Sequence, residues 1–136
     1  MRIFLDANIL FSAAKSDGAI RRLVALLQTT GHECWVDGFV EAEAKRNLEA
    51  KFPSALADLD TLLSGLTRAK GGASPSLLET AGRLLPEKDR PVLAAAIALG
   101  CDALVTGDKT HFGALYGKTF SGVTVFSPAA LAAKVL

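Results

Sequence analysis

The sequence predicts an α/β protein with three layers, in which helices cover both faces of a central parallel sheet of four to five strands. Short apolar runs alternate along the chain with longer segments whose apolar residues recur at helical spacing. A connection between neighbouring parallel strands has to cross over the sheet, and a helix between successive strands supplies that crossover. The chain has 136 residues, which is the usual size of one domain, so we expect a single domain over residues 1–136.

The composition excludes several classes of protein. Half of the residues are hydrophobic and 21% are charged, which is the opposite of a disordered chain. The longest apolar run is shorter than the roughly 20 residues of a membrane span, and the N-terminal run stops at Asp6, too early for a signal peptide. Cys34 and Cys101 have no metal-binding or disulfide spacing. We therefore expect a cytoplasmic protein without a membrane partner. A net charge of +1 provides no general attraction for a polyanion.

Three strands are predicted in the first half of the chain, over residues 2–5, 33–36 and 66–69. A helix follows the first strand over residues 9–15. Apolar residues at positions 20, 23, 24 and 27 predict the next helix, with Asp17 as a possible N-cap and Gly31 as its stop. Part of the apolar surface of this helix, at Leu23, Leu26 and Leu27, is assigned to the core rather than to a partner. Residues 39–52 form a further helix, and Pro53 separates it from another that begins near residue 54 and reaches at least residue 63.

The second half continues the alternation. Ser74 and Pro75 have the N-cap and N1 signature of a helix that extends to residue 85. Residues 91–99 are apolar almost all round, which is typical of a buried helix, and Gly100 suits its left-handed end. Strands are expected over residues 103–105 and 123–126, with a turn over residues 110–116 between them. Ser127 and Pro128 begin the last helix.

Acidic residues follow two of the predicted strands. Asp6 ends the first strand, and Asp108 comes shortly after the strand over residues 103–105. Ligands of open parallel sheets bind at the carboxyl ends of the strands. If these two strands are neighbours, the carboxylates repel one another unless a divalent cation lies between them. An alternative for Asp6, Asp89 and Asp108 alike is the N-cap of the helix or turn that follows each of them.

Two glutamates compete as a further acid. Glu41 has Lys45 one turn and Glu49 two turns further along the helix, which is typical of a solvated row of charges. Glu43 lies at the edge of the inward face, so we favour Glu43 and keep Glu41 as the fallback. His32 and His111 are interpreted as surface histidines, and His111 is kept in view because it is close to Asp108.

The sequence resembles a PIN domain in four segments that together span nearly the whole chain. These are Ile3–Leu10 around Asp6, Glu43–Leu48, Asp89 before an alanine-rich helix, and Leu104–Phe112 around Asp108. The resemblance implies a sheet in the order 3-2-1-4-5, which brings the four acids together. Many small bacterial and archaeal members of the family, the VapC-like proteins, are toxins of type II toxin-antitoxin pairs, and the sequence resembles these members.

The resemblance also implies the chemistry. Asp6, Glu43, Asp89 and Asp108 take the catalytic, metal-binding positions, for one or two Mg²⁺ or Mn²⁺ ions, and Asn8 and Thr106 match positions that support the acids. The implied reaction is hydrolysis of RNA phosphodiester bonds, leaving a 5′-phosphate and a 3′-hydroxyl. Where many members have a hydroxyl residue between the first Asp and the Asn, this chain has Ala7. The implied partners are an RNA substrate, a cognate antitoxin and a second copy in a homodimer.

Oxygen ligands favour Mg²⁺ or Mn²⁺ on chemical grounds as well. The proposed phosphate contacts are the basic residues nearest the acids, with Arg21, Arg22 and Lys88 as further candidates. The nearest are Lys45, Arg46, Arg90 and Lys109. The alternative function is a catalytically weak PIN-like domain that binds RNA or protein. A haloacid-dehalogenase-like phosphatase is disfavoured because Asn8 and Phe112 stand where that family needs aspartates.

Overall fold

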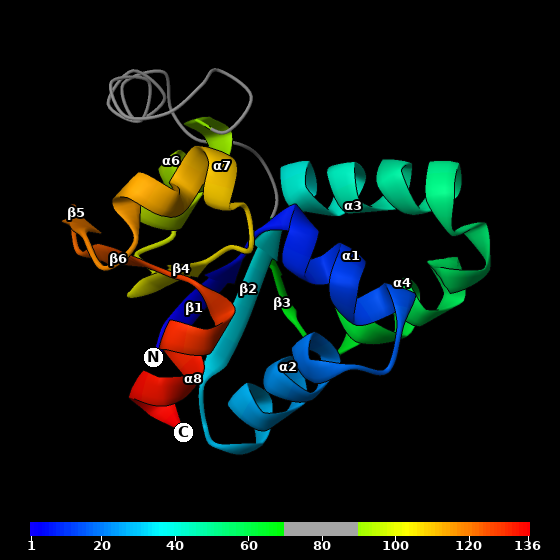
Figure 1. Cartoon of the computed structure of the whole chain (residues 1–136), viewed down its shortest axis with the longest axis horizontal. Helices are drawn as coiled ribbons and strands as arrows, with labels where there is room; N and C mark the ends of the chain where they lie inside the picture. The colour runs from blue at the N-terminus through cyan, green and yellow to red at the C-terminus, as the bar shows by residue number, and fades with distance from the viewer. Residues whose placement is uncertain (70–89) are drawn as a thin grey trace.

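The computed structural model describes residues 1–69 and 90–136, and in this part of the chain six strands form one sheet (Figure 1). The strand order is β3-β2-β1-β4-β6-β5. All neighbours pair in parallel except β5 and β6. The parallel strands are β1 (Arg2–Leu5), β2 (Glu33–Asp37), β3 (Thr67–Ala69), β4 (Ala103–Val105) and β6 (Val123–Phe126). With β6 counted as the fifth predicted strand, the expected order 3-2-1-4-5 is confirmed.

The sheet has six strands in the described residues, whereas four to five were expected. β5 (Thr119–Phe120) pairs antiparallel with β6 at the edge of the sheet. Ser121 and Gly122 connect the two strands, and both have positive φ, at 49° and 86°. Positive φ at both central residues defines the two-residue turn that best matches the twist of a hairpin. A strand of two residues is too short to show an alternating pattern, so no pattern in the sequence predicts it.

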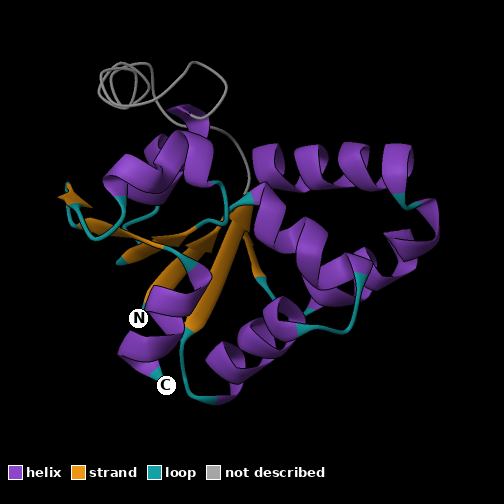
Figure 2. Ribbon diagram, viewed as in Figure 1, coloured by secondary structure: helices purple, strands orange, loops and turns teal. Residues whose placement is uncertain are grey.

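Helices cover the sheet on both faces (Figure 2). α6 (Arg90–Ala98) and α7 (Lys109–Phe112) lie on one face, and α1 (Ala7–Lys15), α2 (Ala19–Thr29) and α8 (Pro128–Val135) lie on the other. α3 (Gly38–Lys51) and α4 (Leu56–Ser64) pack against α1, with a 3₁₀ turn at Pro53–Ala55 between them. A second 3₁₀ turn, Gly113–Leu115, follows α7. The three-layer α/β/α prediction is confirmed.

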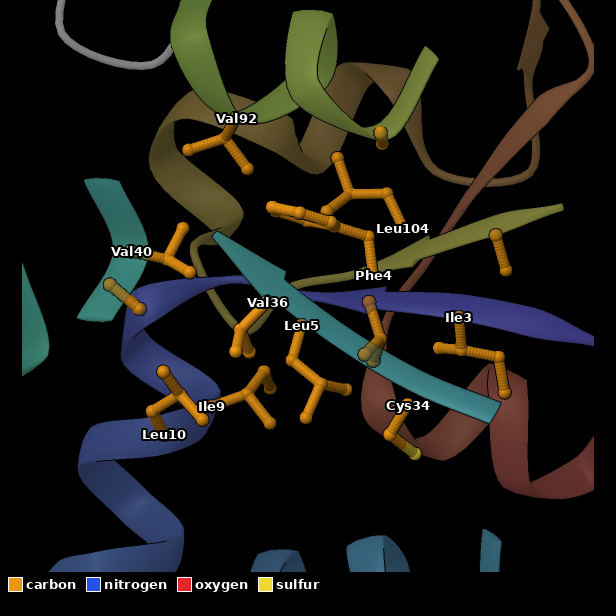
Figure 3. Packing of buried hydrophobic residues seen from close by; sticks show 14 of the residues in the cluster. Ile3, Phe4, Leu5, Ile9, Leu10, Cys34, Val36, Val40, Val92 and Leu104 are labelled. Carbon is orange, nitrogen blue, oxygen red and sulfur yellow. The ribbon is translucent and has the colours of Figure 1, made fainter. Parts of the chain in front are cut away.

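The core lies on both sides of the parallel strands, as Figure 3 shows. Phe4 and Leu104 point toward α6, whereas Leu5 and Val36 point toward α1. All four side chains are fully buried. Successive residues of a strand point to opposite faces, and a parallel sheet covered by helices is therefore apolar on both. This explains why the strands appear in the sequence as short continuous apolar runs.

Several helix ends are fixed by the residues that the sequence indicated. Ser127 accepts a hydrogen bond from the backbone N–H of Ala130 at 3.2 Å, and Gly100 has a φ of 64° at the end of α6. The predicted cap at Asp17 is wrong, because Gly18 is the N-cap of α2 and makes no side-chain hydrogen bond there. The helix predicted over residues 74–85 lies outside the described residues.

The apolar residues of α2 are divided between the core and the solvent. Leu23 and Leu27 belong to the core as predicted, whereas Leu26 is 48% exposed, because it lies on the outer side of α2. In residues 1–69 and 90–136, no helix combines the length and the apolar character that crossing a membrane requires.

Candidate active site

A pocket of about 230 Å³ opens at the carboxyl ends of β1 and β4. Three carboxylates from different parts of the chain line it. Asp6 follows β1, Asp108 follows β4, and Glu43 lies on α3. The remaining lining residues come from α1 and α3. The complete lining is Asp6, Ala7, Asn8, Phe11, Glu43, Asn47, Lys51 and Asp108.

Asp6 is only 5% exposed, and hydrogen-bond donors surround its carboxylate. Its Oδ1 accepts the backbone N–H of Ala7 at 2.7 Å, so Asp6 is also the N-cap of α1. Its Oδ2 accepts the Thr106 hydroxyl at 2.7 Å and the Asn8 amide at 3.1 Å. The capping and site interpretations of this residue are therefore compatible. These donors fix the orientation of the carboxylate at the edge of the pocket.

Thr106 connects the two acidic strand ends. Its side chain is fully buried, and its hydroxyl donates to Asp6. The same oxygen accepts the Asn8 amide at 3.2 Å and the backbone N–H of Asp108 at 3.1 Å. Asn8 in turn accepts the backbone N–H of Gly107 at 2.9 Å. A hydroxyl can donate one hydrogen bond and accept two, so the capacity of Thr106 is used completely.

Asp108 is held by the turn that it begins. Its Oδ1 accepts the backbone N–H of His111 at 3.2 Å, and its Oδ2 lies 2.7 Å from Nδ1 of the same histidine. Both side chains are about one quarter exposed. The interpretation of His111 as an ordinary surface histidine is wrong, because its ring packs beside Asp108. Tyr116 lies close by, and burial raises its pKa, with the charges of Asp108 and Asp6 adding to the rise.

The structure separates the two glutamates of α3. Glu43 lines the pocket. Glu41 accepts Nε and Nη2 of Arg68 from β3, at 3.1 Å and 2.5 Å, and its side chain is only 18% exposed. Lys45 and Glu49 are exposed as expected for a solvated row of charges, but the expectation is wrong for Glu41, which pairs with Arg68. Residues two positions apart on a helix point about 200° apart, so the two carboxylates cannot occupy one site.

The basic residues proposed as phosphate contacts have different surroundings. Lys45 and Arg46 are exposed on α3, outside the residues that line the pocket. Lys109 is exposed next to Asp108, and Arg22 is exposed on α2. Arg21 donates to the carbonyl oxygens of Ala13 and Ala14 at the end of α1. Lys88, the side chain of Arg90 and the acid Asp89 lie outside the described residues.

Sequence reasoning missed three residues of the pocket lining. Asn47 and Lys51 follow Glu43 at intervals of four along α3, and Phe11 lies on α1. The spacing of four residues is a signal in the sequence, because it places side chains on one face of a helix. The signal is usable only when the direction of that face is known.

The donor set fits a hard divalent cation by its chemistry. The pocket is lined by carboxylate and carboxamide oxygens, which suit Mg²⁺ and Mn²⁺ rather than zinc. Within the described part of the chain, no three His, Cys, Asp or Glu side chains form a group that could hold a metal ion. Asp89, the other predicted ligand, is not among these residues.

Comparison with known families identifies the fold. The profile of the PIN domain matches residues 2–110. The chain belongs to the PIN domain family. This PIN domain has no match among curated protein sequences.

Solved structures share the fold of this PIN domain at low sequence identity. VapBC2 from Rickettsia felis, solved with a DNA fragment from its promoter, has a TM-score of 0.69 and 19% identity, covering 93% of this chain and 98% of that one. VapC20 from Mycobacterium tuberculosis, a toxin that cleaves the sarcin-ricin loop, has a TM-score of 0.59 and 15% identity, covering 82% and 93%. VapBC-1 from nontypeable Haemophilus influenzae has a TM-score of 0.62 and 13% identity, covering 95% and 99%.

Proposed function

We propose that this PIN domain is a divalent-metal-dependent endoribonuclease that hydrolyses RNA phosphodiester bonds. The observation that carries the proposal is the pocket at the carboxyl edge of the sheet, where Asp6, Glu43 and Asp108 converge from three elements. Membership of the PIN domain family supports this activity. An acidic pocket on its own repels a polyanion, so the proposal includes a cation that reverses the local charge.

Four acids are proposed as ligands of one or two Mg²⁺ or Mn²⁺ ions, namely Asp6, Glu43, Asp89 and Asp108. A bound divalent ion would make its water more acidic and would offset the negative charge that develops on the phosphoryl oxygens. The contribution of the protein is to hold the oxygen ligands in place before substrate arrives. Thr106 and Asn8 perform this role for Asp6, because both donate to its Oδ2.

The residues beside the acids have proposed roles of their own. His111 fixes the orientation of Asp108 through its contact with Oδ2. Lys109, exposed directly after Asp108, is placed to contact a phosphate of the substrate. In the proposed hydrolysis the oxygen of a water molecule bonds to phosphorus, the bond between phosphorus and the 3′ oxygen breaks, and this oxygen takes up a proton. The expected products therefore carry a 5′-phosphate and a 3′-hydroxyl.

The decisive experiment is incubation of purified protein with a mixed RNA pool and Mn²⁺, with EDTA and Asp6→Asn as controls. Wild-type protein should cleave RNA only with the metal, and Asp6→Asn should lose the activity while its circular dichroism spectrum is unchanged. Full activity of Asp6→Asn would contradict the proposed mechanism. Intact RNA with wild-type protein would instead favour the alternative, a PIN domain that only binds RNA or protein.

The biological role that we propose is that of a toxin in a type II toxin-antitoxin pair. Support comes from the VapBC complexes and the VapC toxin that share this fold. The proposed partners are therefore a cognate antitoxin and a second copy of the chain, and the proposed place of action is the cytoplasm. Expression of wild-type protein should arrest growth of a bacterial host, and Asp6→Asn should not.

A further inference from the structure

Two phenylalanines and two lysines form a cluster where α1 and α3 end. The Phe/Lys patch consists of Phe11 and Lys15 from α1 and of Lys51 and Phe52 from the end of α3. The two rings pack edge to face, with centroids 5.9 Å apart. Lys15 Nζ lies 4.9 Å from the ring centre of Phe52, and Lys51 Nζ lies 5.8 Å from that of Phe11. The patch therefore combines aromatic faces with two positive charges.

The Phe/Lys patch continues the acidic pocket. Phe11 and Lys51 line the same pocket as Asp6 and Glu43. Glu43 and Lys51 are eight residues apart on α3, which corresponds to roughly 12 Å along the helix axis. The pocket thus has a negative end at the sheet and a positive, aromatic end at the tips of the two helices. A polymer with one phosphate at the carboxylates has to continue across other surface, and Phe11 and Lys51 of the patch line the same pocket as these carboxylates.

The exposure of the patch distinguishes it from ordinary core packing. Phe52 is 39% exposed, although a large apolar side chain is usually buried more completely. Both lysines are exposed as well. Stabilisation of the helix ends accounts for the contact between the rings, but it requires neither a partly exposed Phe52 ring nor a lysine, Lys51, that lines a pocket with three carboxylates. Unpaired bases stack on aromatic side chains, and lysines contact the phosphates between them.

We propose that the Phe/Lys patch binds the nucleotide adjoining the scissile phosphate in single-stranded RNA. The base of this nucleotide stacks on Phe52, with Phe11 supporting the ring, and Lys51 contacts the next phosphate. The substrate has to be single-stranded at this point, because the faces of bases in a duplex are already covered by their neighbours. This inference rests on the proposed function, since it deepens the description of the substrate of that site.

The test compares variants of the patch in binding and in cleavage. Binding is measured by fluorescence anisotropy with a labelled single-stranded RNA at a constant concentration of Mg²⁺, in the Asp6→Asn background, so that no cleavage occurs. Phe52→Leu removes the aromatic face, Phe52→Tyr keeps it, and Lys51→Gln removes a charge. Lys134→Gln, at an exposed position near the end of α8, is the matched control.

Each variant has its own expected result. Phe52→Leu should weaken binding about 5- to 10-fold, the lower part of the range for one stacked base, and Phe52→Tyr should restore it. Lys51→Gln should reduce the slope of log K against log salt by about 0.7, the value for one phosphate contact on a single strand. Lys134→Gln should leave the slope unchanged. In the cleaving enzyme, Phe52→Leu should raise KM more than it lowers kcat.

The outcomes separate this inference from the proposed nuclease activity. If Asp6-dependent cleavage occurs but Phe52→Leu and Lys51→Gln change neither the affinity nor KM, the patch does not bind RNA and the nuclease proposal stands. If the protein cleaves no RNA but both variants weaken binding as expected, the patch stands and the nuclease proposal is wrong. If Phe52→Leu is found to be unfolded in a thermal unfolding test, the affinity of Phe52→Tyr and the salt slope of Lys51→Gln still test whether the patch binds RNA. An unchanged salt slope in Lys51→Gln then overturns the proposal.

Discussion

At the scale of single residues, Thr106 has an unusual concentration of contacts. Its buried hydroxyl joins Asp6, Asn8 and the backbone of Asp108, so one oxygen atom links both acidic strand ends. The Tyr116 hydroxyl also donates to the Thr106 carbonyl at 2.8 Å. The proposed ligands are thus coupled through a residue that has no charge and does not line the pocket.

We therefore predict that Thr106→Val impairs both stability and activity. Valine has a similar shape, but it leaves the backbone N–H of Asp108 without its acceptor and removes a donor from Asp6. The free energy of unfolding should fall by about 1–3 kcal/mol, the range for an unsatisfied buried group. The cleavage rate should fall roughly 10- to 100-fold, as is typical for residues that orient metal ligands. Urea unfolding and initial rates measure the two effects, and Thr106→Ser should recover most of both. A valine variant with the wild-type rate would contradict the positioning role.

Asp37 is a buried acid that caps a helix. It is 3% exposed at the N-terminus of α3, where its Oδ1 accepts the backbone N–H of Val40 at 3.1 Å. Burial raises the pKa of this carboxyl above its usual 3.8, although backbone hydrogen bonds oppose the rise. The folded state therefore binds a proton more tightly than the unfolded state. Through this group, the free energy of unfolding falls as the pH rises from about 3.8 through the raised pKa of the folded state.

Asp37→Asn should consequently stabilise the protein at pH 7, because asparagine keeps the capping oxygen and carries no charge. The difference in the free energy of unfolding between the variant and wild type should grow with rising pH and then become constant. Urea unfolding at a series of pH values from 4 to 7 measures it. A variant that is less stable than wild type at pH 7 would mean that the capping carboxylate outweighs the cost of its burial.

The residues also show what a sequence can predict of a site. Asp6 and Asp108 were predicted as site residues because they follow buried strands, Asp6 directly and Asp108 three residues after the strand ends. Glu43 was preferred over Glu41 because the helical pattern distinguishes the two sides of α3. Phe11 and Lys51 were not predicted. Their approach depends on how α1 packs against α3, and no local pattern specifies that packing.

At the scale of secondary structure elements, the two sides of α3 have separate tasks. One side presents Glu43, Asn47 and Lys51 to the pocket, and another pairs Glu41 with Arg68 of β3. The helix thus links the edge of the sheet to the proposed site. The end of α3 was predictable because Pro53 follows it. The pairing of Glu41 was not predictable, because Arg68 lies on β3, 27 residues further along the chain.

This division of α3 predicts opposite results for two similar substitutions. Glu43→Gln should abolish metal-dependent cleavage, because it removes a proposed ligand and leaves the shape of the side chain nearly unchanged. Glu41→Gln should keep the cleavage rate and lose at most about 1 kcal/mol of stability, because ion pairs near the surface contribute little. Rates and urea unfolding of both variants provide the measurement. Loss of cleavage in Glu41→Gln alone would assign the ligand to the fallback glutamate.

At the scale of the whole molecule, the positions of the charges affect the stability of the folded state more than the net charge does. The chain has 15 basic and 14 acidic residues, yet three carboxylates gather in one pocket of about 230 Å³. Like charges that line one pocket repel one another, and this destabilises the folded state because the same charges are further apart in the unfolded chain. The near-neutral composition gave no indication of this concentration. It arises from the strand order, which places β1 next to β4.

Because of this concentration of charge, the stability of the protein should depend on divalent metal ions. Mg²⁺ or Mn²⁺ should stabilise wild-type protein against unfolding, by about 2.7 kcal/mol when the free ion is 100-fold above its dissociation constant. In EDTA, Glu43→Gln should be at least as stable as wild type, because one of the mutually repelling charges is gone. With the metal present the order should reverse, since the variant has lost a proposed ligand. Thermal unfolding with EDTA, with MgCl₂ and with NaCl of equal ionic strength distinguishes binding from general screening. If NaCl stabilises both proteins as much as MgCl₂ does, the carboxylates are merely screened and do not form a metal site.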